Sequence, residues 1–233
     1  MIVVTGAAGF IGSYLIQRLN QDNFNAIIAV DKFDNEVKNK NLVGSKIKER
    51  VDRNLFLSWL DKNCETVEFI FHIGACTDTA EFDLNLFNKL NTGYSKEVWK
   101  RCCNYQIPLV YASSAANYDL GESGQKNDES KILVLEPVNQ HELSKQEFDV
   151  WALEQPDKPF FWAGLTLFDV YGKNENSSNE DQKRDFAYVK DVIEVCLCFM
   201  YNRKDSGIYN VGLVNDSAKA VFVSKKINIV LNT

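Results

Sequence analysis

Three glycines lie close together near the start of the chain, at Gly6, Gly9 and Gly12. They follow a short apolar run and open an amphipathic stretch, so the spacing Gly-x-x-Gly-x-x-Gly falls between a predicted strand and a predicted helix. Glycine permits a tight turn and a close backbone approach, and the free N–H groups at a helix start attract phosphate. Together with Phe10 and Ile11, these residues predict a binding loop for the pyrophosphate of a dinucleotide.

An acidic residue stands where the next strand is predicted to end. Asp31 closes the run 26–31, and a carboxylate at this distance from the glycines can accept a hydrogen bond from an adenosine ribose. Lys32, Lys38 and Arg53 follow, and positive charge there can bind a 2′-phosphate. The pattern favours NADP over NAD as the cofactor, while each cation alone also fits a solvated surface position.

Ser114, His141 and Lys145 could take part in acid/base chemistry or hydrogen bonding. Ser114 follows the predicted strand 109–113, and sheets of this kind bind ligands at the carboxyl ends of their strands. Lys145 lies in the predicted helix 143–153, where its charge can lower the pKa of a neighbouring acid. His141 lies four residues earlier and can transfer a proton near neutral pH, since its ordinary pKa is ~6.5. The alternatives are a serine that satisfies backbone groups, a surface lysine and a partly exposed histidine at a helix start.

Short apolar runs alternate with longer amphipathic stretches, which is typical of βαβ units. The pattern predicts an α/β fold with a doubly wound parallel sheet of the Rossmann type, containing about six strands. We expect a nucleotide-binding domain over 1–172 and, over 173–233, the remnant of a substrate lobe with the last elements. The loops are expected at 121–130 and 173–183, and the tail 213–233 is expected to add one helix and one strand. The predicted strands are 2–5, 25–31, 68–73, 109–113, 160–167 and 207–211, and the predicted helices are 11–20, 85–105, 143–153 and 189–201.

Several segments between the first residue and residue 212 carry a resemblance that is more specific than the glycines alone. Together they resemble the extended short-chain dehydrogenase/reductase superfamily and, within it, the NADP-dependent sugar-nucleotide epimerases that act at C6 of an ADP-heptose. The segments are 4–12, 70–77, 111–118, Pro137 with Asn139 and Ser144-Lys145, 168–172 and 184–191.

The resemblance implies oxidation at heptose C6 to a transient ketone and return of the hydride to the opposite face, in the synthesis of lipopolysaccharide core precursors. It implies a nucleotide-sugar substrate and, because epimerases of this type generally assemble, a homo-oligomer. Residues implied around the cofactor are Asp31, Lys32, Lys38, Arg53, Ala75, Asn91 and Lys145, and residues implied around the substrate are Ser114, Asp169 and Arg184.

The sequence departs from this family at the proposed chemistry. His141 stands where the superfamily has the tyrosine of its Tyr-x-x-x-Lys pair, and the loop 173–183 has no counterpart of the lysine used as a second acid/base group. Asp169 replaces an asparagine, and Thr166 replaces an arginine. The match also implies an internal deletion and the loss of most of the C-terminal substrate lobe. Because losing an acid/base group costs roughly 10² to 10⁴ in rate, we expect weak catalysis or none.

Three hypotheses follow from the sequence. The first is a sugar-nucleotide epimerase of the heptose type. The second is a degenerate homologue that binds NADP without turnover. The third is a dehydrogenase or reductase of the same superfamily, which would pass the hydride to an external acceptor.

Composition excludes other classes of partner. The net charge of −6 and the pI near 5.1 provide no basic surface for nucleic acid. No apolar run is long enough for a membrane span, and the first residues lack the basic segment of a signal peptide, so we expect a soluble, cytoplasmic protein. The six cysteines show no paired Cys-x-x-Cys spacing, so no metal site is expected.

Overall fold

A computed structural model describes residues 1–76, 88–114, 140–173, 186–213 and 221–224. In this part of the chain one large sheet contains the strands β1 (Ile2–Thr5), β2 (Ile27–Asp31), β3 (Glu49–Asp52), β4 (Phe69–His72), β5 (Leu109–Ser114), β6 (Trp162–Leu167), β9 (Gly207–Leu213) and β10 (Val221–Ser224). Their order is β10-β9-β6-β5-β4-β1-β2-β3, and all neighbours are parallel except the antiparallel pair β9 and β10. The predicted doubly wound parallel sheet is confirmed.

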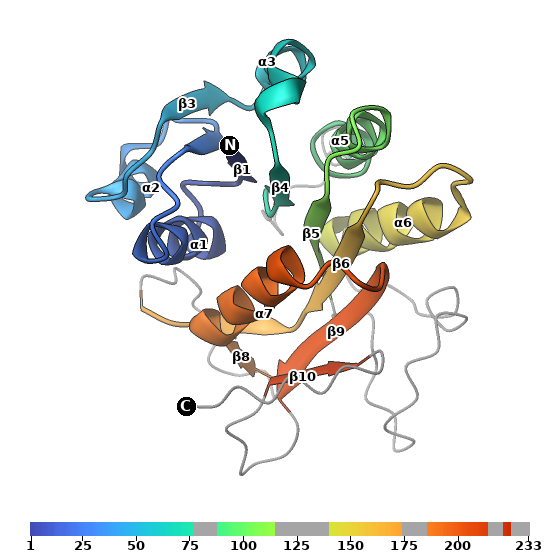
Figure 1. The fold of residues 1–233 in the computed structure, drawn as a ribbon. Coiled ribbons are helices and arrows are strands. Elements are labelled where there is room, and N and C mark those ends of the chain that lie inside the picture. The colour runs from blue at the N-terminus through green and yellow to red at the C-terminus, as the bar shows by residue number, and fades with distance from the viewer. Residues whose placement is uncertain (77–87, 115–139, 174–185, 214–220, 225–233) are drawn as a thin grey trace.

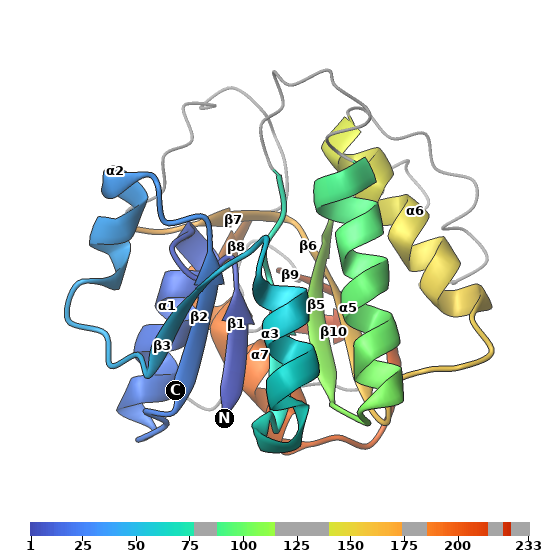
Figure 2. The ribbon, with the colours of Figure 1, turned by 90° about the horizontal axis from the view of Figure 1, so that it is seen from above.

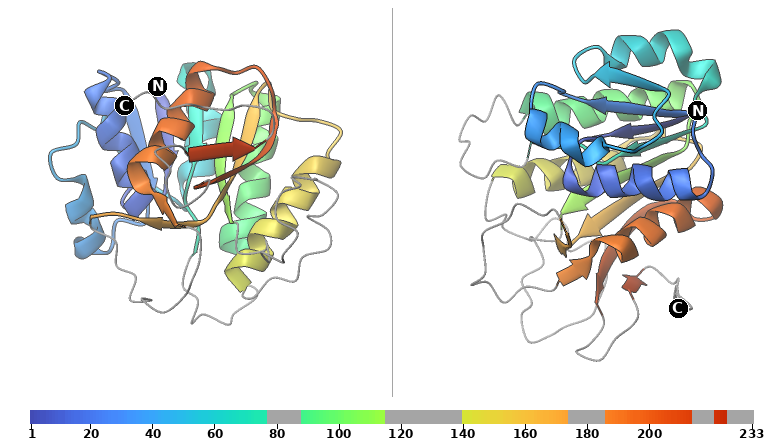
Figure 3. Two further views of the ribbon diagram at one scale, coloured as in Figure 1. Left: turned by 90° about the horizontal axis from the view of Figure 1, so that it is seen from below. Right: turned by 90° about the vertical axis from the view of Figure 1, so that its left-hand side faces the viewer.

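Helices cover both faces of the sheet, as Figure 1 shows. One face carries α1 (Phe10–Gln21) and α7 (Val189–Tyr201), and the other carries α3 (Phe56–Asn63), α5 (Gly93–Asn104) and α6 (Gln140–Glu154). The right panel of Figure 3 shows α3 and α5 above the strands and α1 and α7 below them. The shorter elements are α2 (Glu36–Asn39), the 3-10 turns η1 (Lys40–Leu42) and η2 (Cys64–Thr66), the π-helical turn η3 (Asn88–Thr92), and the parallel pair β7 (Asp169–Tyr171) and β8 (Phe186–Tyr188).

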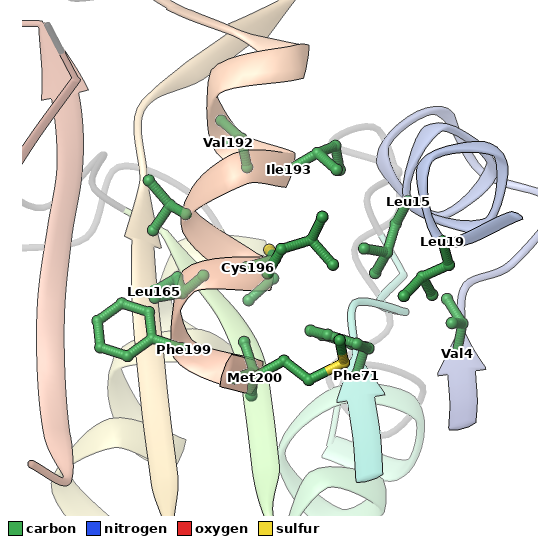
Figure 4. Close-up of a cluster of buried hydrophobic side chains, with 14 of the residues drawn as sticks. Val4, Leu15, Leu19, Phe71, Leu165, Val192, Ile193, Cys196, Phe199 and Met200 are labelled. Carbon is green, nitrogen blue, oxygen red and sulfur yellow. The ribbon is translucent and has the colours of Figure 1, made fainter. Parts of the chain in front are cut away.

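Alternation along the central strands divides the core into two layers. Val4 and Phe71 point toward α1 and α7, where Figure 4 shows them beside Leu15, Leu19 and Met200. The opposite layer contains the buried rings of α5, α6 and the facing strands. Each fully buried Val, Leu, Phe or Met side chain contributes ~1.5–3 kcal/mol to the free energy of folding. Both layers therefore hold the strands in fixed positions. The rings of the opposite layer include Trp99, Tyr111, Phe148 and Trp162.

Most predicted elements agree with the structure to within a few residues. The strand 2–5 and the helix 189–201 have the predicted bounds, whereas the predicted helix 85–105 contains the π-helical turn η3 before α5 begins at Gly93. The elements α2, β3, α3, β7 and β8 were not predicted from the sequence. The loop 121–130, most of the loop 173–183 and most of the tail lie outside the described residues, although β10 supplies a strand in that tail. Among the helices that are described, none is both long and apolar enough to cross a membrane.

Candidate functional site

The loop after β1 is built from backbone that leaves no space for side chains. Gly6 has a φ of 67°, and a Cβ atom there would lie 2.6 Å from the Cα of Gly74. A Cβ atom on Gly12 would lie 2.1 Å from the carbonyl oxygen of Gly6. No side chain caps the start of α1 in the described structure, where Gly9 is the N-cap residue. The first N–H groups of α1 are therefore available to an anion, which fits the pyrophosphate of a dinucleotide.

Asp31 lies at the end of β2, directly beside this loop. Its Oδ2 accepts a hydrogen bond from the backbone N–H of Ala8 at 2.9 Å, and its Oδ1 accepts one from the N–H of Lys32 at 2.8 Å. Asn41 also contributes by donating from Nδ2 to the carbonyl oxygen of Ala8 at 3.0 Å. A carboxylate has about four acceptor positions, so Asp31 can hold the loop and still accept from a ribose hydroxyl.

Two of the three predicted cations lie close to Asp31. The backbone N–H of Arg53 donates to the carbonyl oxygen of Asp31 at 3.1 Å, and Nε of Arg53 is buried without a hydrogen-bond partner among the described residues. The side chain of Lys32 forms a hydrogen-bonded ion pair with Asp34. The hydrogen bond from Lys32 is the main cause that lowers the pKa of Asp34. Lys38 lies at the exposed surface of α2.

Phe10 and Ile11 form the first turn of α1 and are half-buried. The ring of Phe10 packs edge to face on Tyr14 with 5.5 Å between centroids, and the Tyr14 hydroxyl donates to the carbonyl oxygen of Lys173 at 2.8 Å. A Cβ atom on Gly172 would lie 3.2 Å from the Phe10 ring. The start of α1 therefore contacts the segment that follows β7.

Asn91 connects the segment after β4 to the start of α6. Its Oδ1 accepts from the N–H of Cys76 at 2.7 Å, so it holds the backbone next to Ala75. Its Nδ2 donates to Oγ of Ser144 at 2.9 Å, and that hydroxyl donates to the carbonyl oxygen of His141 at 2.7 Å. Asn91 lies in the π-helical turn η3, a form of backbone that occurs frequently at functional sites.

Lys145 is buried in α6, with 5% of its surface exposed, and its Nζ donates to the carbonyl oxygen of Ala112 at 2.6 Å. Burial lowers the pKa of Lys145 to about 8, opposed by the charge of Asp149. Burial and then the charge of Lys145 lower the pKa of His141 to about 4. At neutral pH the pair therefore consists of a mostly charged ammonium group and a neutral imidazole.

The implied substrate residues are only partly described. Ser114 is half-buried and is the last residue of β5, at the same end of that strand as the contact between Lys145 and Ala112. Asp169 begins β7, but nothing is described of its side chain, and Arg184 lies outside the described residues. Thr166 in β6 is buried, and its hydroxyl has no hydrogen-bond partner in the described structure.

Two groups of buried polar residues near this site were not singled out in the sequence. Asp149 accepts hydrogen bonds from residues of β5, and His72 lies between Thr5 and Ser95. Asp149 could have been noticed, because it follows Lys145 by four residues on a helix and so shares its face. His72 gave no such signal, since its partners are distant in the sequence.

Comparisons with known proteins agree with this arrangement. The model of the NAD dependent epimerase/dehydratase family matches residues 2–182 and 177–212. The chain belongs to this family.

Several relatives are named as sugar-nucleotide epimerases. The ADP-L-glycero-D-manno-heptose-6-epimerase of Fusobacterium nucleatum subsp. nucleatum is 35% identical over 247 residues, which cover 91% of this chain and 74% of the relative. The protein of that name from Nitratidesulfovibrio vulgaris is 33% identical over 261 residues, which cover 95% of this chain and 80% of the relative.

Solved structures show the same fold. The Helicobacter pylori ADP-L-glycero-D-manno-heptose-6-epimerase superposes with a TM-score of 0.75 at 27% identity, covering 91% of this chain and 76% of that one. The UDP-glucuronic acid 4-epimerase of Bacillus cereus, in complex with UDP-glucuronic acid and NAD, superposes with a TM-score of 0.76 at 21% identity and covers 92% of this chain and 78% of that one.

Proposed function

We propose that the chain is an NADP-dependent epimerase that inverts C6 of an ADP-heptose. The observation that carries the proposal is that two features lie at the carboxyl ends of strands in the same part of the sheet. The glycine loop follows β1, and Lys145, four residues after His141 in α6, contacts the end of β5, with β4 between the two strands. The substrate is taken from the names of the relatives at 33–35% identity.

The binding residues divide into two ends of a dinucleotide site. The start of α1 would hold the pyrophosphate, and Asp31 with the nearby cations would hold the adenosine ribose and its 2′-phosphate. Ala75, Asn91 and Lys145 would line the nicotinamide end, because Asn91 links the residue after Ala75 to the helix that carries Lys145. A bound nicotinamide cofactor supplies the hydride acceptor and donor.

The side chains of the site would handle the proton. Ser114 would donate a hydrogen bond to the reacting oxygen, and a neutral ring nitrogen of His141 would take the hydroxyl proton and return it. Lys145, held by the carbonyl oxygen of Ala112, would keep positive charge beside the reacting oxygen as that oxygen gains negative charge. Asp169 and Arg184 would contribute to substrate binding, as the resemblance implies.

A second candidate function is cofactor binding without turnover. It is favoured by the pKa of His141, because a base with a pKa of about 4 removes an alcohol proton poorly at neutral pH. The two functions share the same cofactor site, so a measurement of cofactor binding alone does not distinguish them. Analysis of the reaction products distinguishes them.

The decisive experiment incubates the purified chain with one C6 epimer of the ADP-heptose and NADP⁺. Appearance of the other epimer by proton NMR, without net cofactor reduction and absent in Lys145→Met, would support the epimerase. Net reduction of NADP⁺ to NADPH at the expense of the substrate, without the other epimer, would indicate a dehydrogenase. Cofactor binding with neither product would indicate the degenerate homologue.

Cofactor choice is tested by titrating stripped protein with NADP⁺ and NAD⁺ and following tryptophan fluorescence. Charged hydrogen bonds contribute ~1.5–3 kcal/mol, so Arg53→Ala should weaken NADP⁺ binding about tenfold or more. The same substitution should change NAD⁺ binding much less, because NAD⁺ lacks the 2′-phosphate. Glu68→Ala, at the exposed side chain of the residue before β4, is a control that should leave both affinities unchanged. Equal losses for the two cofactors would contradict the NADP assignment.

A further inference from the structure

Three successive residues of β5 are bound by side chains of α6. The hydroxyl of Tyr111 donates to Oδ1 of Asp149 at 2.9 Å, and the hydroxyl of Ser113 donates to Oδ2 of the same carboxylate at 2.5 Å. Between them, the carbonyl oxygen of Ala112 accepts from Nζ of Lys145. Tyr111 is 1% exposed, and Ser113, Lys145 and Asp149 are each 5% exposed. These hydrogen bonds therefore lie in the interior, where they define how α6 sits on the strand.

A buried carboxylate is costly, so its presence needs an explanation. Burial raises the pKa of Asp149 to about 6, although the hydrogen bonds from Ser113 and Tyr111 and the charge of Lys145 all act in the opposite direction. Apolar residues of similar size would pack α6 on β5 without this cost. Burial and specific partners that shift a pKa together are typical of functional sites.

The neighbouring strand leaves room for this arrangement. Gly164 in β6 is the register partner of Tyr111, and a Cβ atom on Gly164 would lie 2.4 Å from the Tyr111 hydroxyl oxygen. The Tyr111 ring is stacked against Trp162 and lies edge to face on Phe148, with 6.4 Å and 5.0 Å between the ring centroids. The phenol is thus fixed with its hydroxyl directed at Asp149. Figure 2 shows α6 beside α5 on this side of the sheet.

We propose that Asp149 is a positioning residue for Lys145: its carboxylate fixes α6 on the end of β5 and keeps the ammonium group of Lys145 charged in the candidate active site. This inference rests on the proposed function and assigns a new residue to it. Among the described residues, the charge of Lys145 also acts on the imidazoles of His141 and His72, whose pKa values it lowers, and an imidazole supplies no negative charge. Within the described part of the chain, the charge of Asp149 raises the pKa of Lys145.

The test is a pH titration of Lys145 in protein with isotope-labelled lysine, in which the Lys145 signal is identified by its loss in Lys145→Met. Asp149→Asn should lower the midpoint of Lys145 by about one pH unit or more, a tenfold change in its protonation equilibrium. Ala152→Gly lies on the same helix and also weakens it, but it should leave the midpoint unchanged because it removes no charge. An unshifted midpoint in folded Asp149→Asn would overturn the proposal.

A second variant covers the case in which Asp149→Asn does not fold. The double substitution of Tyr111→Phe and Ser113→Ala removes both hydrogen bonds that stabilise the carboxylate without changing α6. The pKa of Asp149 should then rise toward that of Lys145, so the carboxyl group is neutral over part of the pH range in which Lys145 titrates and the midpoint of Lys145 again falls. A midpoint that stays in place, with Asp149 shown to be neutral, would contradict the proposal.

Kinetics give an independent readout where the chain is active. Asp149→Asn should lower kcat by about 10² and change KM for the sugar nucleotide little, since a displacement of roughly 1 Å in a catalytic group costs that much. Asp149→Glu, which keeps the charge, should recover part of the rate. A KM effect without a kcat effect would overturn the positioning role. If the chain proves inactive, the proposed function fails, whereas the titration of Lys145 still decides this inference.

Discussion

Thr5 and His72 are register partners at the carboxyl ends of β1 and β4, and Oγ1 of Thr5 lies 2.8 Å from Nδ1 of His72. The same hydroxyl accepts a hydrogen bond from the N–H of Gly74 at 3.1 Å, and Nε2 of His72 lies 2.9 Å from Oγ of Ser95 in α5. Thr5, His72 and Ser95 are each buried. These contacts join two strands and a helix directly below the loop in which Gly6 meets Gly74.

Two substitutions of His72 should separate its two hydrogen bonds. Asparagine places a polar atom near the position of Nδ1 and can keep the contact to Thr5, whereas glutamine reaches toward Nε2 and can keep the contact to Ser95. Both variants should lower the Tm because they lose ring packing. Only His72→Gln should weaken dinucleotide binding several-fold, because only it releases Thr5 below the loop. Fluorescence titration with NADP⁺ and thermal unfolding measure the two effects.

Ser95→Ala serves as the control for this comparison. It removes the outer hydrogen bond of His72 and leaves Thr5 untouched, so its dinucleotide Kd should match that of the unmodified chain. Equal Kd values for His72→Asn and His72→Gln would show that the link to Thr5 does not position the loop.

Acid should destabilise the fold through the same histidine. Burial lowers the pKa of His72 to about 3, below its ordinary value of 6.5, so the unfolded chain takes up a proton first as the pH falls. The contribution of His72 to the free energy of unfolding is complete above pH 6.5. It is lost as the pH falls toward 3, at ~1.4 kcal/mol per pH unit. Urea unfolding at neutral pH and at about pH 5 should therefore give a steeper decline for the unmodified chain than for His72→Asn.

The raised pKa of Asp149 acts in the opposite direction. Its contribution to stability is complete below the ordinary pKa of 3.8 and is lost as the pH rises through about 6. Asp149 therefore offsets part of the loss of stability caused by His72 in moderately acidic solution. Because Asp149 is present in both the unmodified chain and His72→Asn, its effect cancels when the two are compared. The acid-stability prediction would be wrong if the two declines had the same slope.

Local patterns explain why much of the cofactor site could be predicted from the sequence. The glycines and Asp31 are separated by one helix and belong to a single βαβ unit, so their mutual position follows from the order of the elements. The strand β3 was missed because only Val51 of its four residues is buried, which leaves no alternation to detect. The helix α3 buries only Phe56 and Leu60, so its apolar face is narrow.

The buried polar contacts depend on tertiary packing and could not be predicted in the same way. The hydroxyl of Ser113 meets Asp149 across 36 residues of sequence, and Thr5 meets His72 across 67. Neither pair has a local spacing that indicates contact. Only the placement of α6 and β4 against their neighbours brings these side chains together.

Two glycine substitutions should distinguish the binding loop from ordinary backbone strain. Gly12→Ala places a methyl group 2.1 Å from the carbonyl oxygen of Gly6, and this backbone atom cannot move without displacing the loop. Gly44 has a φ of 81° and open space around it, so Gly44→Ala should cost only ~1–2 kcal/mol of conformational strain. Both should lower the Tm, and calorimetric titration should show that only Gly12→Ala loses cofactor binding. Retained affinity in Gly12→Ala would contradict the assignment of the loop.

Restoring a phenol at position 141 should increase the rate of epimerisation. At its present pKa of about 4 the imidazole of His141 is a weak base, and the charge of Lys145 should favour the phenolate form of a tyrosine in its place. His141→Tyr should raise kcat by about 10² or more, the usual contribution of a well-matched acid/base group. His141→Phe, which has the same ring without the hydroxyl, should show no gain.

The pH profile gives the matching test of the unmodified chain. A reaction that needs neutral His141 and charged Lys145 should lose rate below about pH 4 and above about pH 8. In His141→Tyr the lower limit should move to higher pH, because a phenol loses its proton at higher pH than this imidazole does, while the upper limit still follows Lys145. If His141→Tyr binds cofactor and sugar nucleotide but gains no rate, and the lower limit stays near pH 4, then His141 does not occupy the acid/base position and the proton must be transferred by another group.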